Sequence, residues 1–218
     1  MTFFSSTEPI LRRKQVVLHC SDLIGLWQIR WRLGRVTLFE ADFTRVDQVF
    51  VGWGLLTGLI FGTAQFLALD WSVQAVVWSL CTVLGAVGMV ALCWCWVMAE
   101  RVVGLVAGWV GLLALGLMLT NVGILTAWEP VVLHLGPLWL TLSALGYLGT
   151  GVRLRSRALV LAGVLHGLCA AIFYAWSDWQ FLGTGTMMSV CLLLLGLCQW
   201  DMHLVAGLLP AQQSQRKP

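Results

Sequence analysis

The sequence has few charged residues for its length. Only 11% of its 218 residues are Asp, Glu, Lys or Arg, whereas 59% are hydrophobic. Because a soluble domain usually carries about 25% charged residues, we exclude a soluble globular protein. The formal net charge of +3 is small, and the basic residues follow the ends of apolar runs instead of forming one patch. This distribution excludes a nucleic-acid-binding protein.

Motifs for hydrolysis, phosphoryl transfer and ion coupling are also missing. The sequence has no Gly-x-Ser-x-Gly, His-Glu-x-x-His or Walker motif. No carboxylate lies in the middle of an apolar run, since Asp47 and Asp201 lie at the ends of such runs. An acid within the membrane is the usual mark of proton or sodium coupling. These absences weigh against an enzyme and against an ion-driven pump.

Cysteine chemistry is not expected either. Most of the seven cysteines lie inside apolar runs, where they serve as small buried hydrophobic residues and not as a disulfide framework. Cys93 and Cys95 resemble a metal motif, but residues two apart on a helix point to nearly opposite sides. We therefore predict no catalytic residue and no metal site.

Long apolar runs are what the sequence has in abundance. Six runs are each long enough for the roughly 20 residues that a membrane helix needs, and they are continuous, which favours helices over a membrane β-barrel. We predict an all-α, six-helix transmembrane domain over residues 46–203. The six predicted spans are Val46–Leu69, Ser72–Ala99, Val102–Ala127, Pro130–Gly151, Ala158–Trp176 and Phe181–Trp200.

Loop charges orient this predicted bundle. Basic residues occupy only two loops, and the other three loops each carry one carboxylate beside a tryptophan. With six spans, all thirteen Lys and Arg residues fall on one side, which the positive-inside rule makes cytoplasmic. Both termini, including a tail at 204–218, are then cytoplasmic, in a bacterial inner or thylakoid-type membrane. The residues that set this topology are Arg101, Arg153, Arg155 and Arg157.

Residues 1–45 form a basic N-terminal segment that holds seven of the thirteen Lys and Arg residues. Its opening lacks the order of a signal peptide, so we expect it to be retained. Two structures fit residues 23–39. One is a segment that lies on the cytoplasmic membrane face with its apolar residues on one side of a helix. The other is a hairpin that turns at Gly34 and docks on a partner, and we favour the first.

Small residues recur at helical spacing on three predicted spans. In membranes, helices associate through close packing, and glycines four apart permit it. We expect these glycines to pack helices within the bundle, with span one as the place for contact with a partner subunit. They are Gly54, Gly58, Gly62, Gly104, Gly108, Gly163 and Gly167.

A few aromatic and polar residues lie deep in the predicted spans. At about 1.5 Å per residue, Trp109 and Trp139 are roughly 12 and 14 Å from their nearer boundaries. With Tyr147 and His166 they form the predicted ligand pocket near the midplane. His166 is either a neutral histidine bonded to a neighbouring helix, a polar ligand contact or an axial ligand of a chlorophyll or haem. A bis-histidine haem with His134 is disfavoured, because their depths differ by roughly 10 Å.

Two resemblances bear on these hypotheses. The spacing Ala162-x-x-x-His166 resembles the pigment-binding pattern of bacterial light-harvesting peptides, and it implies a tetrapyrrole. Residues 128–203 resemble a family of small, uncharacterised bacterial integral membrane proteins through HLGPLWLTLSALGYLGTG (134–151) and GLCQWDMH (196–203). That family implies no activity.

Three functions remain open on the sequence alone. The first is a non-enzymatic auxiliary or assembly subunit of a larger membrane complex, which associates with other subunits or with itself. The second is a small-solute permease or the substrate-capture subunit of a transporter, because the size and six spans are similar to those of vitamin-binding subunits of energy-coupling transporters. The third is a tetrapyrrole-binding membrane subunit.

Overall fold

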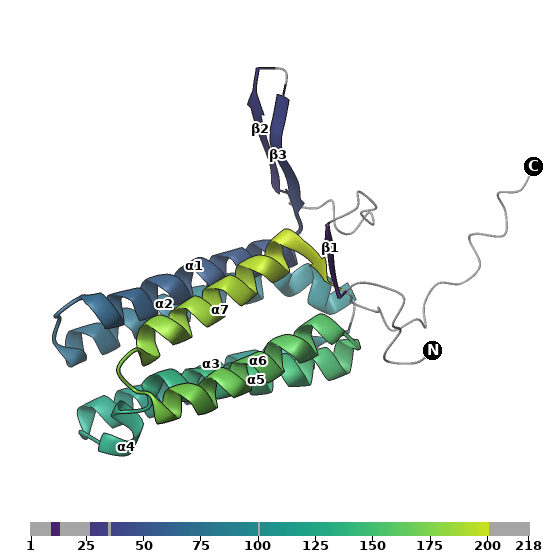
Figure 1. Cartoon of the computed structure of the whole chain (residues 1–218). Helices are drawn as coiled ribbons and strands as arrows, with labels where there is room; N and C mark the ends of the chain where they lie inside the picture. Colours follow the sequence, from purple (N-terminus) through teal and green to yellow (C-terminus); the bar gives the residue numbers. More distant parts are fainter. Residues whose placement is uncertain (1–9, 14–26, 35, 100, 201–218) are drawn as a thin grey trace, which may run out of the picture.

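The computed structural model describes residues 10–13, 27–34, 36–99 and 101–200, and within these ranges the chain is mostly α-helical (Figure 1). The helices are α1 (Arg45–Phe66), α2 (Trp71–Ala99), α3 (Val103–Leu125), α4 (Glu129–Val132), α5 (Leu135–Leu154), α6 (Arg157–Ala175) and α7 (Gln180–Leu197). The strands are β1 (Leu11–Arg13), β2 (Trp27–Leu33), β3 (Val36–Phe43) and β4 (Cys198–Trp200).

Five helices of the described part, α1, α2, α3, α6 and α7, are long and apolar enough to cross a membrane. Their bounds agree with five of the predicted spans to within three residues. Helix α5 has a sufficient length of 20 residues but is less apolar than these five, because glycines, hydroxyl residues and a tyrosine separate its leucines. The membrane character of the chain therefore rests on these five helices.

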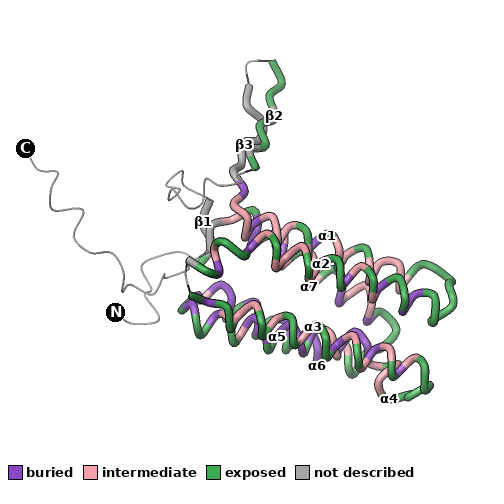
Figure 2. Tube along the Cα trace, turned by 180° about the vertical axis from the view of Figure 1, so that it is seen from behind, coloured by how far each residue is buried: buried purple, intermediate pink, exposed green. Residues whose placement is uncertain are grey.

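The long helices form two layers. Figures 1 and 2 show α1, α2 and α7 in one layer and α3, α5 and α6 in the other. The most extensive contact is between α1 and α7, although these helices are the first and the last of the described chain, and the next is between α5 and α6. A Cβ on Gly54 would lie only 3.1 Å from Leu193 of α7, and Ser189 Oγ donates to Gly54 O at 2.6 Å. Small residues and a side-chain hydrogen bond thus hold these two helices together, as is usual in membranes.

The predicted fourth span, Pro130–Gly151, is wrong at its outer end. The chain forms the short helix α4, breaks at Leu133 and His134, and only then begins α5. The buried side chain of Gln180, the first residue of α7, bridges this break. Its Oε1 accepts from Gly136 N at 3.1 Å, and its Nε2 donates to Leu133 O at 2.8 Å. A continuous helix would have paired Gly136 N with Val132 O, but Leu133 O would have had no partner, because Pro137 has no N–H. A residue distant in sequence therefore satisfies both backbone groups.

A β-hairpin of β2 and β3 precedes the bundle. Of the two structures considered for residues 23–39, the hairpin is the one present over 27–33 and 36–39, so the helical alternative is wrong there, and residues 23–26 lie outside the described residues. Gly34 adopts a φ of 63° at the turn, a conformation that glycine reaches without steric cost. The alternation of apolar and polar residues in β2 is the strand period of two.

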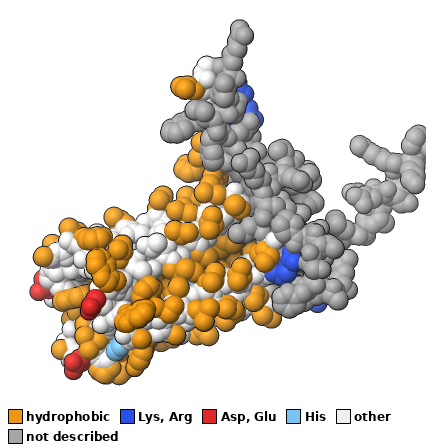
Figure 3. All heavy atoms as spheres, viewed as in Figure 1, with side chains coloured by type: hydrophobic (Ala, Val, Ile, Leu, Met, Phe, Trp, Pro, Cys, Tyr) orange, Lys and Arg blue, Asp and Glu red, His pale blue; other side chains and the backbone are white. Residues whose placement is uncertain are grey.

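Charge separates the two ends of the bundle. The described arginines at helix ends lie at one end, which we call the basic end, and the loop carboxylates Asp70, Glu129 and Asp178 lie at the other, the acidic end (Figure 3). Arg101 and Arg155 both have a positive φ in tight turns, and Arg153 and Arg157 flank the second of these turns. The predicted tail 204–218 lies outside the described residues.

Candidate functional site

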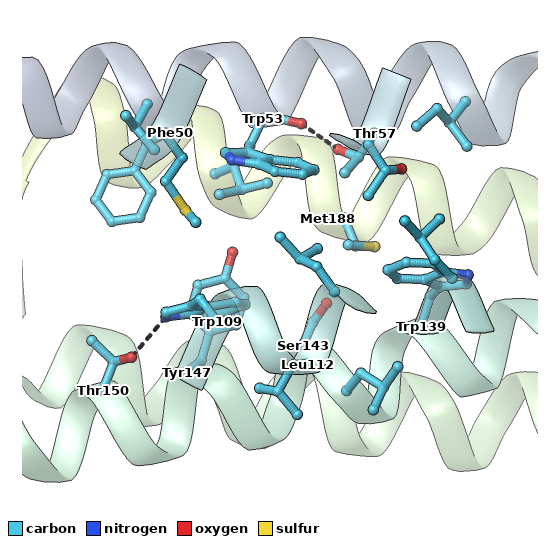
Figure 4. A pocket seen from close by; sticks show the side chains of 18 of the residues that line it. Phe50, Trp53, Thr57, Trp109, Leu112, Trp139, Ser143, Tyr147, Thr150 and Met188 are labelled. Carbon is cyan, nitrogen blue, oxygen red and sulfur yellow. Dashed lines mark hydrogen bonds between the residues drawn. The ribbon is translucent and has the colours of Figure 1, made fainter. Parts of the chain in front are cut away.

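A cavity of about 170 Å³ lies between the two helix layers. Its wall is almost entirely apolar, with contributions from α1, α2, α3, α5, α6 and α7. Figure 4 shows its central part, where Trp53 of α1 faces Trp109 and Leu112 of α3 and Trp139 and Tyr147 of α5. A cavity with an apolar lining stays empty of water and accepts apolar molecules.

The indole rings of Trp109 and Trp139, two of the tryptophans that line the cavity, are held by hydrogen bonds to threonines. Trp109 Nε1 donates to Thr150 Oγ1 at 2.9 Å, and Trp139 Nε1 donates to Thr120 Oγ1 at 3.2 Å. In each case the partner lies on the neighbouring helix, so the bond also joins α3 to α5. Because the polar edge of each ring is satisfied, what the ring offers to the cavity is apolar surface.

Glycines give these two rings their space. A Cβ on Gly146 would lie 2.5 Å from the Trp109 ring, and one on Gly116 would lie 2.8 Å from the Trp139 ring. Each ring therefore lies flat against the backbone of the opposite helix. Gly116 and Gly146 belong to the site as much as the tryptophans do, although neither carries a side chain.

Two hydroxyl groups of α5 face the cavity without a partner among the described residues. Ser143 and Tyr147 are one helical turn apart and line the same wall. Figure 4 shows the Tyr147 hydroxyl directed into the space between the layers. Tyr147 is fixed by aromatic contacts, with Trp109 at 5.2 Å and His166 at 4.9 Å between ring centroids. The wall thus presents one polar strip, which suits a molecule that carries a hydroxyl or carbonyl group on an apolar body.

His166 does not line the cavity. It is fully buried behind Tyr147, and its Nδ1 lies 2.7 Å from Ala162 O. Its Nε2 is buried and has no partner within the described part of the chain. No space for a macrocycle adjoins that nitrogen, so the residues around His166 do not fit a tetrapyrrole. His134 is half-buried, stacks on Tyr174 and lies at the acidic end, apart from His166.

Of the four residues of the predicted pocket, only three therefore line the cavity. The structure brings Trp109, Trp139 and Tyr147 to one wall and leaves His166 outside it. Sequence reasoning missed Trp53, which faces them from α1. The same rise per residue would have revealed it, because Trp53 lies eight residues inside α1, or roughly 12 Å from the boundary, at the depth of Trp109.

The glycines expected to pack helices divide into two groups. Those with another helix close to their Cβ position are Gly54, Gly58, Gly163 and Gly167. Those with open space at that position are Gly62, Gly104 and Gly108. Gly163 and Gly167 of α6 pack on α5, and Gly54 and Gly58 of α1 pack on α7. Gly104 and Gly108 of α3 are exposed.

Comparison of the chain with protein-family models, with curated proteins and with solved structures gave no match. The resemblance of residues 128–203 to small bacterial membrane proteins stays a prediction. Among the described residues, no group of three His, Cys, Asp or Glu side chains is placed to hold a metal ion. The cavity itself offers aromatic surface and a few hydroxyl groups, among them those of Ser143 and Tyr147, an arrangement suited to binding.

Proposed function

We propose that the chain crosses the membrane six times, with α5 as the additional span. The contact between α5 and α6 is more extensive than that of any other helix pair except α1 and α7. The backbone groups at the break before α5 form hydrogen bonds with Gln180. With six spans the basic end is cytoplasmic by the positive-inside rule, as are both termini. A bacterial inner or thylakoid-type membrane suits this arrangement.

We propose further that the protein is non-enzymatic and captures a small, mainly apolar molecule, as a permease or the substrate-capture subunit of a transporter does. The cavity between the helix layers carries this proposal. Ligand sites are concave, mostly apolar and provided with a few placed polar groups, and this cavity has the aromatic wall and the Ser143 and Tyr147 hydroxyls. No carboxylate lines it, so the ligand is not a cation held by charge.

The volume narrows the choice of ligand. Sites for drug-sized molecules measure about 300–1,000 Å³, and an apolar cavity of about 150 Å³ holds benzene. A cavity of about 170 Å³ therefore suits a substituted single ring or a short stretch of an apolar chain with one polar group. A tetrapyrrole is too large.

Binding can be tested with a fluorinated alkylphenol and the protein in lipid nanodiscs. In ¹⁹F NMR the probe should show a saturable bound resonance distinct from those of the probe in water and in lipid. Leu112→Trp fills the cavity and should abolish this resonance. Leu115→Trp is the matched control, because Leu115 is exposed on the same helix. The proposal fails if wild type shows no saturable resonance, or if both variants retain it.

An auxiliary or assembly subunit is the second candidate, and the exposed face of α3 favours it. Gly104, Ala107, Gly108 and Gly111 form a surface of small residues, and the three glycines have open space around them. Such surfaces allow close approach of another helix. Co-migration with other membrane proteins in a native gel, lost on Gly108→Leu, would support this role. A protein that purifies alone from mild detergent would contradict it.

A further inference from the structure

The hairpin of β2 and β3 has one apolar and one polar side. In β2, Trp27, Ile29 and Leu33 alternate with Arg30 and Arg32, and successive side chains of a strand point to opposite faces. The apolar residues are highly exposed, at 64% for Trp27, 40% for Ile29 and 74% for Leu33. A single face of a two-stranded sheet that exposes this much apolar surface needs a cover in order to be stable.

The register continues this division onto β3. Trp27 pairs with Phe43, Ile29 with Ala41 and Leu33 with Val36, so apolar positions stand opposite apolar positions. Arg30 pairs with Glu40, and Gln28 pairs with Asp42. The polar side therefore combines basic and acidic positions and has no strong net charge, so its chemistry is that of a surface facing water.

The end of the hairpin that adjoins α1 is fixed to the bundle. Phe43 is buried, and Gln48 Nε2 donates to its carbonyl oxygen at 3.2 Å. Thr44 and Asp47 form a capping box, in which Thr44 N donates to Asp47 Oδ2 at 2.8 Å and Asp47 N donates to Thr44 Oγ1 at 3.3 Å. These bonds satisfy the first turn of α1 and fix the angle at which β3 enters it.

Because of the angle between β3 and α1, the hairpin runs across the helix axes at the basic end of the bundle (Figures 1 and 2). If the helices cross the membrane, the hairpin then runs along its cytoplasmic surface. Figure 3 shows the described hydrophobic side chains of the hairpin on the side toward the acidic end, and its described basic side chains on the opposite side. The apolar side thus faces the lipid, and the arginines face the water.

We infer that the hairpin is an interfacial anchor whose apolar face is covered by the lipid bilayer beside the bundle. Tryptophan prefers the interface between headgroups and acyl chains, and an amphipathic element lies in that plane with its apolar face inward. Since two acidic positions of β3 balance the two arginines of β2, docking depends on apolar burial and not on anionic headgroups. The inference rests on the proposed six-span arrangement and not on ligand binding, so a failed ligand test leaves it intact.

Depth measurement tests this inference on the full chain in nanodiscs. An environment-sensitive fluorescent amino acid is placed at position 33 or, as the matched control, at position 32 of the same strand. Lipids with a nitroxide high on the acyl chain should quench the probe at 33 strongly and the probe at 32 weakly. Quenching should be equal in phosphatidylcholine and phosphatidylglycerol nanodiscs, and it should survive about 1 M salt, at which the screening length is about 3 Å.

Two substitutions separate apolar docking from ionic docking. Ile29→Gln should lower the ratio of docked to undocked hairpin about tenfold, because burial of such a side chain is lost, whereas Arg32→Gln should change it less than about twofold. Equal quenching at positions 32 and 33, or quenching that requires anionic lipid, would overturn the inference. So would a probe at 33 that is exposed in nanodiscs but shielded in native membranes, which would indicate a protein partner.

Discussion

The contact between Gly146 and Trp109 allows a quantitative test of how the cavity wall is built. In Gly146→Ala the new methyl group would lie 2.5–2.7 Å from three atoms of the Trp109 ring, closer than any stable contact. The ring cannot tilt away freely, because its Nε1 donates to Thr150 Oγ1 at 2.9 Å. Relief of the clash therefore requires either breaking this bond or separating α3 from α5.

The expected loss of stability has two contributions, the overpacking and the loss of the hydrogen bond. Overpacking costs about 1–3 kcal/mol, and a hydrogen bond between membrane helices contributes about 0.6 kcal/mol on average and up to about 1.7. Gly146→Ala should thus lower the free energy of unfolding by about 2–4 kcal/mol. Gly149→Ala is the control on the same helix. Gly149 is exposed with nothing near its Cβ position, so the change should be neutral or stabilising by up to about 1 kcal/mol.

Unfolding by SDS in mixed micelles, followed by circular dichroism, measures the free energy of unfolding of both variants. A double-mutant cycle with Trp109→Leu then isolates the contact, since the penalty at Gly146 should shrink by about 2 kcal/mol when the ring is absent. Equal stabilities of Gly146→Ala and Gly149→Ala would refute the reasoning. A penalty that persists in the Trp109→Leu background would show that some other contact is responsible.

Two further predictions concern the acidic end. Gln180→Leu leaves Gly136 N and Leu133 O without their partner at the break before α5. Because Gly136 N is buried, the change should cost about 1–3 kcal/mol by the same unfolding assay, and an unchanged stability would contradict the bridging role of Gln180. Hydrogen bonds from the side chain and backbone of Ser72 lower the pKa of Asp70 in the folded protein. The stabilisation of the folded state by these bonds is therefore complete above the unfolded pKa, which is near 3.8. It is lost as the pH falls through the lower folded pKa. Ser72→Ala removes the hydroxyl and should raise the pKa of Asp70 in a ¹³C carboxyl NMR titration, and no change would exclude the Ser72 hydroxyl as a cause.

Helix positions were predictable because a bilayer imposes a simple length rule. Five spans were located to within three residues from apolar runs alone. The fourth run misled, because Pro130 and His134 belong to a short helix and a break whose backbone groups are satisfied by Gln180. Hydropathy cannot detect a hydrogen bond from a residue more than forty positions away in the chain.

The candidate site was predictable only in part. Depth along a span follows from residue counting, which put Trp109 and Trp139 near the midplane, and both line the cavity. Rotation about the helix axis does not follow from it in spans that are apolar on every side. His166 therefore points behind Tyr147, and Trp53 and Leu112 entered the wall unpredicted.

The sequence by itself determined that the chain forms helices long and apolar enough to cross a membrane, where most of these helices begin and end, and which loops carry basic residues. Burial in lipid, the spacing of apolar runs and the chemistry of loops are local properties, so residue order is sufficient for them. Only the tertiary structure decided that α1 pairs with α7, that a cavity remains between two layers, and that residues 27–43 form a hairpin across the helix axes. These features depend on which faces of uniformly apolar helices meet, and close packing of glycines and hydroxyls chooses among them.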